Sequence, residues 1–238
     1  MSWRDWLPTP QQMSDAAQLR PSPFGAITMR QGMGMILFLG LVAGIVPLFG
    51  DWILGLRTGS AVPLARLGQV GAWLELRLAS EPFPVLFLGD LRPWAFFLQT
   101  LPQMETGMPG WLGATLSALG RWVQRPLDWL GLWIVYGALV MVVNKALGAT
   151  HTLQRFYAAT AFAFVPLLFT GLAPIPCVGQ PLSWLARLWA VAVYLQASRQ
   201  VTGFSWSRTG VAVLLPGAVA GALMGSLLLG LVLLSLLL

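Results

Sequence analysis

The carboxyl-terminal segment of the chain, Gly210 to Leu238, contains no charged side chain. The whole chain is 57% hydrophobic and only 9% charged, whereas soluble domains carry roughly 25% charged residues. A soluble fold of 238 residues needs far more polar surface than this chain supplies. We therefore expect an integral membrane protein.

Five apolar segments are long enough to be helices that cross the bilayer. The first, residues 33–56, would extend about 36 Å at about 1.5 Å per residue, which exceeds a hydrocarbon core of roughly 30 Å, and we expect Pro47 to kink it. The others are residues 128–145, 156–173, 182–198 and 210–238. The predicted fold class is an all-α integral membrane helical bundle with about five transmembrane helices.

Residues 57–126 differ from these spans because they hold six Arg and four acidic side chains. We expect interfacial helices or a re-entrant pair there, with Trp at headgroup level; a buried cap of the bundle is the alternative. The predicted organisation is an amino-terminal cytoplasmic segment (1–31), a first transmembrane helix (33–56), this interfacial region (57–126) and a four-helix transmembrane domain (127–238).

The charges are placed unevenly along the chain. All eight acids lie at or before Asp128. The later cations are single and flank apolar runs, which is typical of topology markers and not of a nucleic-acid-binding face. The loops on the amino-terminal side, residues 1–31, 145–155 and 199–208, carry three, two and two Lys or Arg. We therefore expect a cytoplasmic amino terminus, at the inner membrane if the protein is bacterial, since long loops such as 57–125 weigh less.

No pattern of catalytic residues stands out. The single cysteine, Cys177, excludes an internal disulfide and a thiolate metal cluster. His151 is the only histidine, and a general base usually needs an orienting carboxylate, yet no acid follows Asp128. We interpret His151 as an exposed loop residue. No phosphate-binding loop, metal-ligand cluster or carboxylate pair is present, so the prediction is a protein without catalysis.

Arg187 is the most informative single residue. It precedes Arg199 by about 18 Å along a helix axis, which places it inside the hydrocarbon, in the outer half. A guanidinium there costs about 2.5–3.5 kcal/mol unless it is paired or snorkels. The same count along the helices places Asp51 and Asp128 near the outer half of the bilayer. We hypothesise an intramembrane polar cluster in which Arg187 pairs with one of them; snorkelling toward the outer interface, aided by Trp184 and Trp189, is the alternative.

Glycines at helical spacing occur in two of the predicted spans. Gly217, Gly221 and Gly225 form two overlapping small-xxx-small units in the last span, and Gly40 and Gly44 form another in the first. Such spacing lets helix backbones approach closely in lipid. The glycines are therefore helix-packing candidates, either within their own bundle or with a second copy or partner.

The segment around the only histidine is expected to be a hinge between two helices. Gly148 would end the first helix, and Thr150 or Thr152 would cap the next. Residues 127–238 resemble the Yip family, the Ypt/Rab-interacting multipass membrane proteins, in a loop that runs from a helix end into a Thr-x-x-x-Phe step. The positions that carry the resemblance are Lys145, Gly148, Thr152, Phe156 and Pro166, followed by Leu188, Trp189, Gly203, Ser205, Arg208 and Pro216. The acidic and aromatic motifs of the eukaryotic members are missing, so small-GTPase binding is not carried over.

The resemblance implies a non-enzymatic membrane protein that organises membrane or scaffolds partners. Two alternatives remain open: an accessory subunit of a larger, for instance bioenergetic, membrane complex, and a small transporter or channel. The expected partners are membrane lipids and other membrane proteins or a second copy, with no nucleic acid. No cofactor is identified by the sequence, although a bound lipid or pigment is compatible with it.

Overall fold

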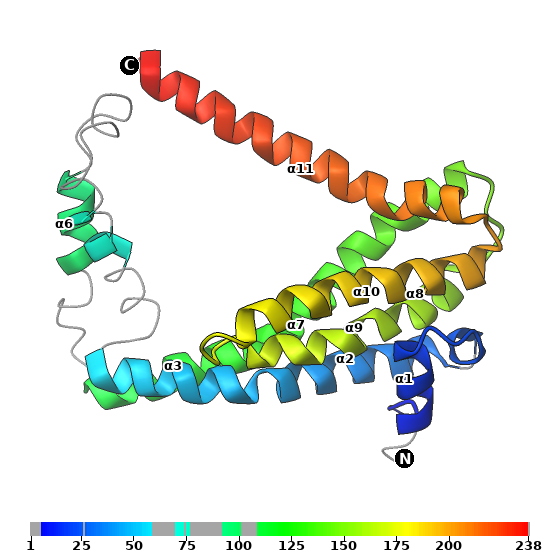
Figure 1. The fold of residues 1–238 in the computed structure, drawn as a ribbon, viewed down its shortest axis with the longest axis horizontal. Coiled ribbons are helices and arrows are strands. Elements are labelled where there is room, and N and C mark those ends of the chain that lie inside the picture. The colour runs from blue at the N-terminus through cyan, green and yellow to red at the C-terminus, as the bar shows by residue number, and fades with distance from the viewer. Residues whose placement is uncertain are drawn as a thin grey trace. The chain divides into compact units, whose positions relative to one another are not determined.

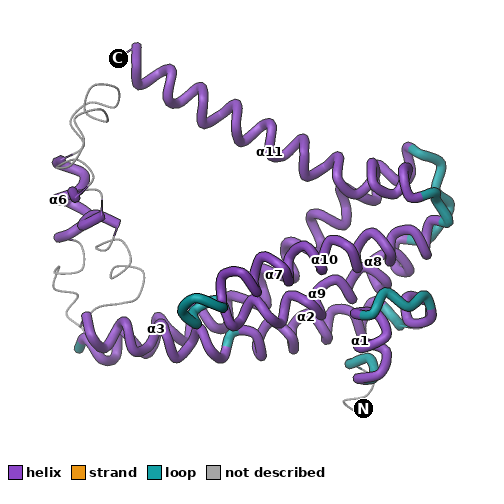
Figure 2. Tube along the Cα trace, in the orientation of Figure 1, coloured by secondary structure: helices purple, strands orange, loops and turns teal. Residues whose placement is uncertain are grey.

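The computed structural model describes residues 6–25, 27–58, 70–73, 75–76, 92–100 and 109–237. Every one of these residues lies in a helix, a turn or a loop, and no strand occurs among them (Figure 2). The chain divides into two compact units: residues 1–47 with 122–219, and residues 48–121 with 220–238. The predicted all-α fold class agrees with this part of the chain.

The described α-helices and 3₁₀ helices (η) follow one another in a simple order, with α7 and α11 the longest (Figure 1). They are α1 (Pro10–Ala17), η2 (Ser22–Gly25), α2 (Met29–Ala43), α3 (Ile45–Thr58), α6 (Arg92–Thr100), α7 (Gly110–Ala146), α8 (Leu153–Thr160), η4 (Ala161–Ala163), α9 (Phe164–Leu167), η5 (Leu168–Leu172), α10 (Gly179–Thr202) and α11 (Trp206–Leu237).

Two to three of the five predicted spans are supported by helix length and composition. The helix Gly110–Ala146 and the helical segment Leu153–Leu172 are each long and apolar enough to cross a membrane, and α2 with α3 forms a bent pair that qualifies if the two are one span. Residues 182–198 and most of 210–238 form helices α10 and α11. The described structure is therefore compatible with a membrane bundle.

The segment 153–172 forms the centre of the first unit. Nine consecutive residues, 156–164, are buried, and α8 contacts both α2 and α10. Figure 1 shows these helices running side by side. A helix that is apolar and covered all round belongs in a core, so the first unit is built around this segment.

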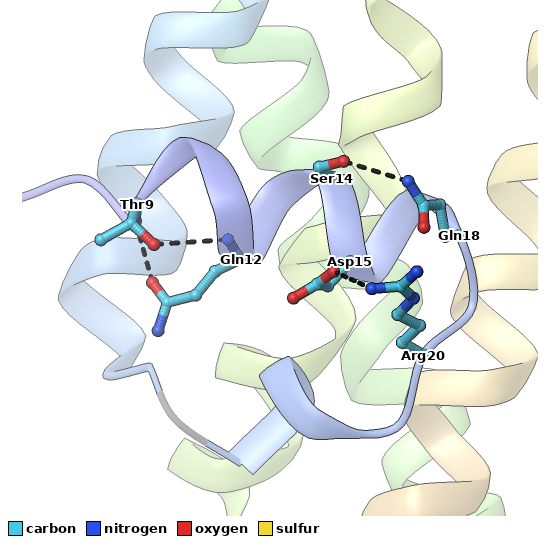
Figure 3. A network of polar contacts seen from close by, with 6 residues as sticks. All are labelled: Thr9, Gln12, Ser14, Asp15, Gln18 and Arg20. Atoms are coloured by element: carbon cyan, nitrogen blue, oxygen red, sulfur yellow. Dashed lines mark hydrogen bonds and ion pairs between the residues drawn. The ribbon is translucent and has the colours of Figure 1, made fainter.

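The amino-terminal residues belong to the first unit and are not a separate segment. Both α1 and α2 begin with a capping box, in which a Thr and a Gln three residues later each bond the other's backbone N–H. The pair is Thr9 and Gln12 in α1, shown in Figure 3, and Thr28 and Gln31 in α2. Phe24 packs edge-on against Phe162, with ring centroids 5.8 Å apart. Residues predicted as a cytoplasmic segment thus cover part of the central helix.

Hydrogen bonds from α10 also hold this amino-terminal part. The indole N–H of Trp189 donates to the Ala17 carbonyl at 2.9 Å. The amide of Gln196 donates to the Leu19 carbonyl at 3.4 Å. These two donors satisfy the carbonyls of the last residue of α1 and of a residue just past its end, where the helix no longer supplies partners.

The first predicted span is broken at Gly44, three residues before the expected kink at Pro47. Pro47 has no N–H, so the carbonyl four residues earlier, that of Ala43, loses its helical donor. The Arg125 guanidinium donates to that carbonyl at 3.0 Å, and the Trp122 indole donates to the Leu41 carbonyl at 2.9 Å. A side chain of α7 therefore replaces the donor missing at Ala43, and a second one adds to the backbone donor that the Leu41 carbonyl already has, the amide of Gly44.

The predicted boundary between residues 126 and 127 falls inside a continuous helix. α7 runs through Pro126 without ending, and α2 packs closely there, since a Cβ added to Gly40 would lie 2.7 Å from the Pro126 Cα. Of the apolar stretch 84–101, residues 92–100 form α6 and the others lie outside the described residues.

Candidate functional site

An apolar groove of about 290 Å³ lies in the first unit among α7, α9, α10 and α11. Its lining surface is almost entirely apolar, and the residues that line it include one cation, Arg187, and three aromatic residues with a polar group, Trp133, Tyr136 and Tyr194. The volume is at the small end of the roughly 300–1,000 Å³ typical of ligand pockets. An apolar ligand with one anionic group would match this lining.

The floor of the groove is fixed by hydrogen bonds between α7 and α8. Trp133, nearly fully buried, donates its indole N–H to the Thr160 hydroxyl at 3.3 Å. The Tyr157 hydroxyl donates to the Ile134 carbonyl at 2.6 Å. The rings of Trp133 and Tyr157 meet edge to face with centroids 4.9 Å apart, an arrangement that adds about 0.5–1.5 kcal/mol beyond area burial.

Tyr136 connects α7 to α11 at one wall of the groove. Its hydroxyl donates to the Val213 carbonyl at 2.5 Å, and its ring meets the Tyr194 ring with centroids 5.7 Å apart. Gly217 lies beside this contact, and a Cβ there would lie 3.6 Å from the Tyr136 hydroxyl. That spacing is ordinary van der Waals contact, so the position would accept a methyl group without a clash.

Tyr194 brings an unsatisfied hydroxyl into the groove lining. The residue is 8% exposed, its hydroxyl oxygen is buried, and no hydrogen bond of normal geometry satisfies it within the described structure. The Thr160 side chain faces it, without a hydrogen bond of normal geometry between the two. A buried hydroxyl without a partner costs about 1–3 kcal/mol, which makes this atom a natural point for a ligand contact.

Arg187 lines the groove and is exposed. Its guanidinium lies 5.1 Å from the Trp184 ring centroid, within cation–π range. No ion pair joins Arg187 to Asp128 in the part of the chain that the structure describes, and Asp128 is exposed. The proposed pairing of Arg187 with an acid therefore stays a prediction, and the contact with Trp184 accords with the snorkelling alternative.

Asp51 has a partner that the sequence did not indicate. In the second unit it pairs with Arg121 at 3.2 Å, and the Trp52 indole donates to the Thr115 hydroxyl at 3.1 Å. Both contacts join α3 to the start of α7. Arg121 lies in the predicted interfacial region, residues 57–126. The sequence therefore does not indicate that it pairs with a residue near the end of the first predicted span.

The five candidate packing glycines have different surroundings. A Cβ at Gly44 would lie 2.6 Å from Trp122, and one at Gly40 would meet Pro126, so both glycines allow α2 to approach α7 within the first unit. Gly217 contacts Tyr136 less closely. Gly221 and Gly225 are exposed, and no heavy atom lies within 4 Å of a Cβ built on either of them.

The hinge between α7 and α8 is a defined turn. Gly148 has φ of +90°, and the amides of Gly148 and Ala149 donate to the carbonyls of Lys145 and Asn144, which is a Schellman arrangement. Thr152 caps α8 by accepting the Arg155 amide at 3.4 Å. Of the remaining positions that carry the family resemblance, Phe156 and Pro166 are buried, so the matched residues shape the turn and the core.

His151 lies in this hinge but is not an exposed side chain. Its ring packs 5.4 Å from that of Phe156, and both ring nitrogens are buried without a hydrogen-bond partner among the described residues. Burial lowers the pKa of His151, and the positive charges of Lys145 and Arg155 lower it further. The ring is therefore held neutral, and no carboxylate orients it as a base.

Sequence reasoning missed the aromatic groove, although the signal was present. Trp133 and Tyr136 recur at a spacing of three residues, which places them on one face of a helix. Tyr194 of α10 lines the groove with them, and Tyr157 of α8 packs against Trp133 outside the lining. Only the packing of these helices against each other shows that their faces form one site.

Comparison of the chain with protein-family models, curated proteins and solved structures finds no significant match. Fold and site therefore define the class of protein by themselves. Its described residues form helices joined by turns and loops, two or three of its helical segments are long and apolar enough to cross a membrane, and its first unit bears an apolar groove lined by one cationic residue, Arg187.

Proposed function

We propose that the chain is a multipass membrane protein, with five spans and a cytoplasmic amino terminus, that organises membrane or scaffolds partners through helix packing. In this proposal it acts as a Yip-type protein and performs no catalysis. The proposal draws on the resemblance of residues 127–238 to that family and on the helix surfaces of the first unit.

The observation that carries the proposal is the apolar outward face of the long helices. On α7 the side chains of Leu132, Val135, Leu139 and Val142 are 57%, 62%, 47% and 68% exposed. They recur at helical spacing and form one stripe. Large uncovered apolar surfaces mark contacts with lipid or with partner proteins.

A second surface favours partner contacts over lipid alone. Gly221 and Gly225 on α11 are exposed, whereas Gly40 and Gly44 on α2 already hold a neighbouring helix. Small residues let a partner helix approach the backbone closely. The open pair on α11 is accordingly the surface through which we expect another helix to dock.

The test is association in native membranes with Gly221→Leu and the matched variant Ala222→Leu, which adds similar bulk about 100° away on the same helix. We expect chemical cross-linking and native gels in mild detergent to show a homodimer or a complex with other membrane proteins. Gly221→Leu should abolish that association and Ala222→Leu should preserve it.

The same experiment separates this proposal from its competitors. Migration of the whole population with one large, stable complex would favour an accessory subunit. A wild-type chain that remains a monomer in cross-linked membranes would contradict scaffolding through helix packing. Loss of a solute flux in Arg187→Leu, with normal accumulation of the protein, would favour a transporter.

A further inference from the structure

We propose that the groove of the first unit binds one acyl chain of an anionic phospholipid whose phosphate is held by Arg187. The inference concerns a ligand and does not depend on whether the chain scaffolds partners. It follows from the shape of the groove, the charge at its edge and the unsatisfied hydroxyl in its wall.

The lining provides an apolar path that begins at a cation. Arg187 and Tyr194 both lie on α10 and are separated by about 10 Å along the helix axis, at about 1.5 Å per residue. Between them, Ala190 and Val191 line the groove. A lipid with its phosphate at Arg187 would place its ester groups between Arg187 and Tyr194 and its acyl chain in the apolar part of the groove beyond them.

Arg187 has the charge and freedom to hold a phosphate. It is exposed, and its guanidinium stacks near Trp184. No carboxylate follows Asp128 in the sequence, so helices α8 to α11 offer no acidic partner. A guanidinium binds phosphate through two parallel hydrogen bonds, and this pairing offsets the cost of a cation at membrane depth.

Tyr194 supplies a second, independent indication of a ligand. Tyr194 lines the groove and is 8% exposed, and its buried hydroxyl oxygen has no hydrogen-bond partner of normal geometry among the described residues. An ester carbonyl of a lipid could accept a hydrogen bond from it. An aliphatic side chain of a partner helix could not, which favours a lipid over a second copy of the chain as the occupant.

The test compares two lipids with the same acyl chains, phosphatidylglycerol and phosphatidylcholine, added to the full chain purified in mild detergent. Native mass spectrometry counts bound lipids. We expect phosphatidylglycerol to bind about tenfold more tightly, because its phosphate carries no neighbouring cation. Arg187→Gln should reduce it to the level of phosphatidylcholine, and Arg208→Gln, an exposed cation outside the groove, should leave the preference intact.

A second pair of variants tests the acyl path. Ala190→Phe should fill the groove and lower the binding of both lipids, and Leu214→Trp should do the same from the exposed wall on α11. Elution volume and thermal unfolding identify any variant that fails to fold. If one of the two variants fails to fold, lipid binding by the other variant decides the test. Soluble glycerol phosphate should not bind, since it has no chain to occupy the groove.

Three outcomes would overturn the proposal. Equal binding of the two lipids by the wild-type chain would remove the role of Arg187. Unchanged lipid binding in a folded groove-filling variant would show that the lipid sits elsewhere. A dimer that is lost in these variants, with no lipid adduct in the wild type, would assign the groove to a second copy of the chain.

Discussion

At the scale of single residues, Tyr157 joins α7 to α8 through both its ring and its hydroxyl group. The ring occupies the space above Gly137, where a Cβ would lie 2.6 Å from a ring carbon. The hydroxyl reaches the Ile134 carbonyl at 2.6 Å. The close approach of the two helices therefore depends on the absence of one methyl group.

We predict that Gly137→Ala destabilises the chain by about 1–3 kcal/mol, the usual cost of overpacking a close contact. Gly131→Ala on the same helix is the matched control: nothing lies within 4 Å of a Cβ there, and alanine is the better helix former by about 1 kcal/mol. Tryptophan fluorescence during thermal unfolding in detergent measures both. Equal unfolding temperatures for the two variants would contradict the contact.

His151 makes a pH-dependent contribution to stability. Its pKa is lowered in the folded chain by burial and by Lys145 and Arg155, while the unfolded chain keeps an ordinary value of about 6.5. Between the two values the unfolded state binds more protons, so stability falls as the pH falls through about 6.5 and levels off below the folded pKa.

We expect the unfolding temperature to decrease between pH 7.5 and pH 5.5 and to do so less in His151→Gln. His151 is the only histidine, so no other imidazole titrates in this range. An identical pH profile in the variant would show that the ring is not held neutral by its surroundings.

At the scale of elements, the break between α2 and α3 is stabilised by α7. Arg125 donates to the carbonyl that Pro47 leaves without a helical donor, and Trp122 donates to the carbonyl of Leu41. A helix end in an apolar environment needs such partners, because an unsatisfied carbonyl costs several kcal/mol in lipid.

A double-mutant cycle tests this compensation. Arg125→Leu alone should be destabilising because it leaves the Ala43 carbonyl without its donor. In a Pro47→Ala background the new backbone N–H can serve that carbonyl, so Arg125→Leu should cost about 1 kcal/mol less. Additive effects on the unfolding temperature would mean that the two residues act independently.

The sequence predicted helix ends correctly where a few neighbouring residues determine them. Gly148 and Thr152 end and begin the helices around the hinge, since a positive φ and a side-chain cap are properties of a few neighbouring residues. Residues 182–198 also form a helix, as their composition indicated.

Signals that depend on packing could not be read from one chain. The close approach of α2 to α7 at Pro126 depends on Gly40, and the covering of the central helix by Phe24 depends on Phe162. The charges of residues 110–126 predict an interfacial helix, because a cation is costly in lipid unless it has a partner. The sequence does not show that Arg121 and Arg125 find acceptors on α3 and α2. The aromatic groove was missed for the same reason.

At the scale of the whole molecule, the central claim is that the helices cross a bilayer with the amino terminus in the cytoplasm. The chain offers a direct probe because its single cysteine, Cys177, is exposed in the turn before α10. That turn is expected on the outer side, and the hinge at residues 147–152 on the cytoplasmic side. The two positions must therefore react differently with a reagent that does not cross membranes.

The deciding measurement is maleimide labelling of intact cells. One set of cells expresses the wild-type chain, and the other expresses a double variant, Cys177→Ser with Thr150→Cys. Thr150 is an exposed position in the hinge. The account predicts that an impermeant maleimide labels Cys177 from outside and labels Thr150→Cys only after the membrane is opened. Labelling of Cys177 only after opening, or of Thr150→Cys from outside, would contradict it.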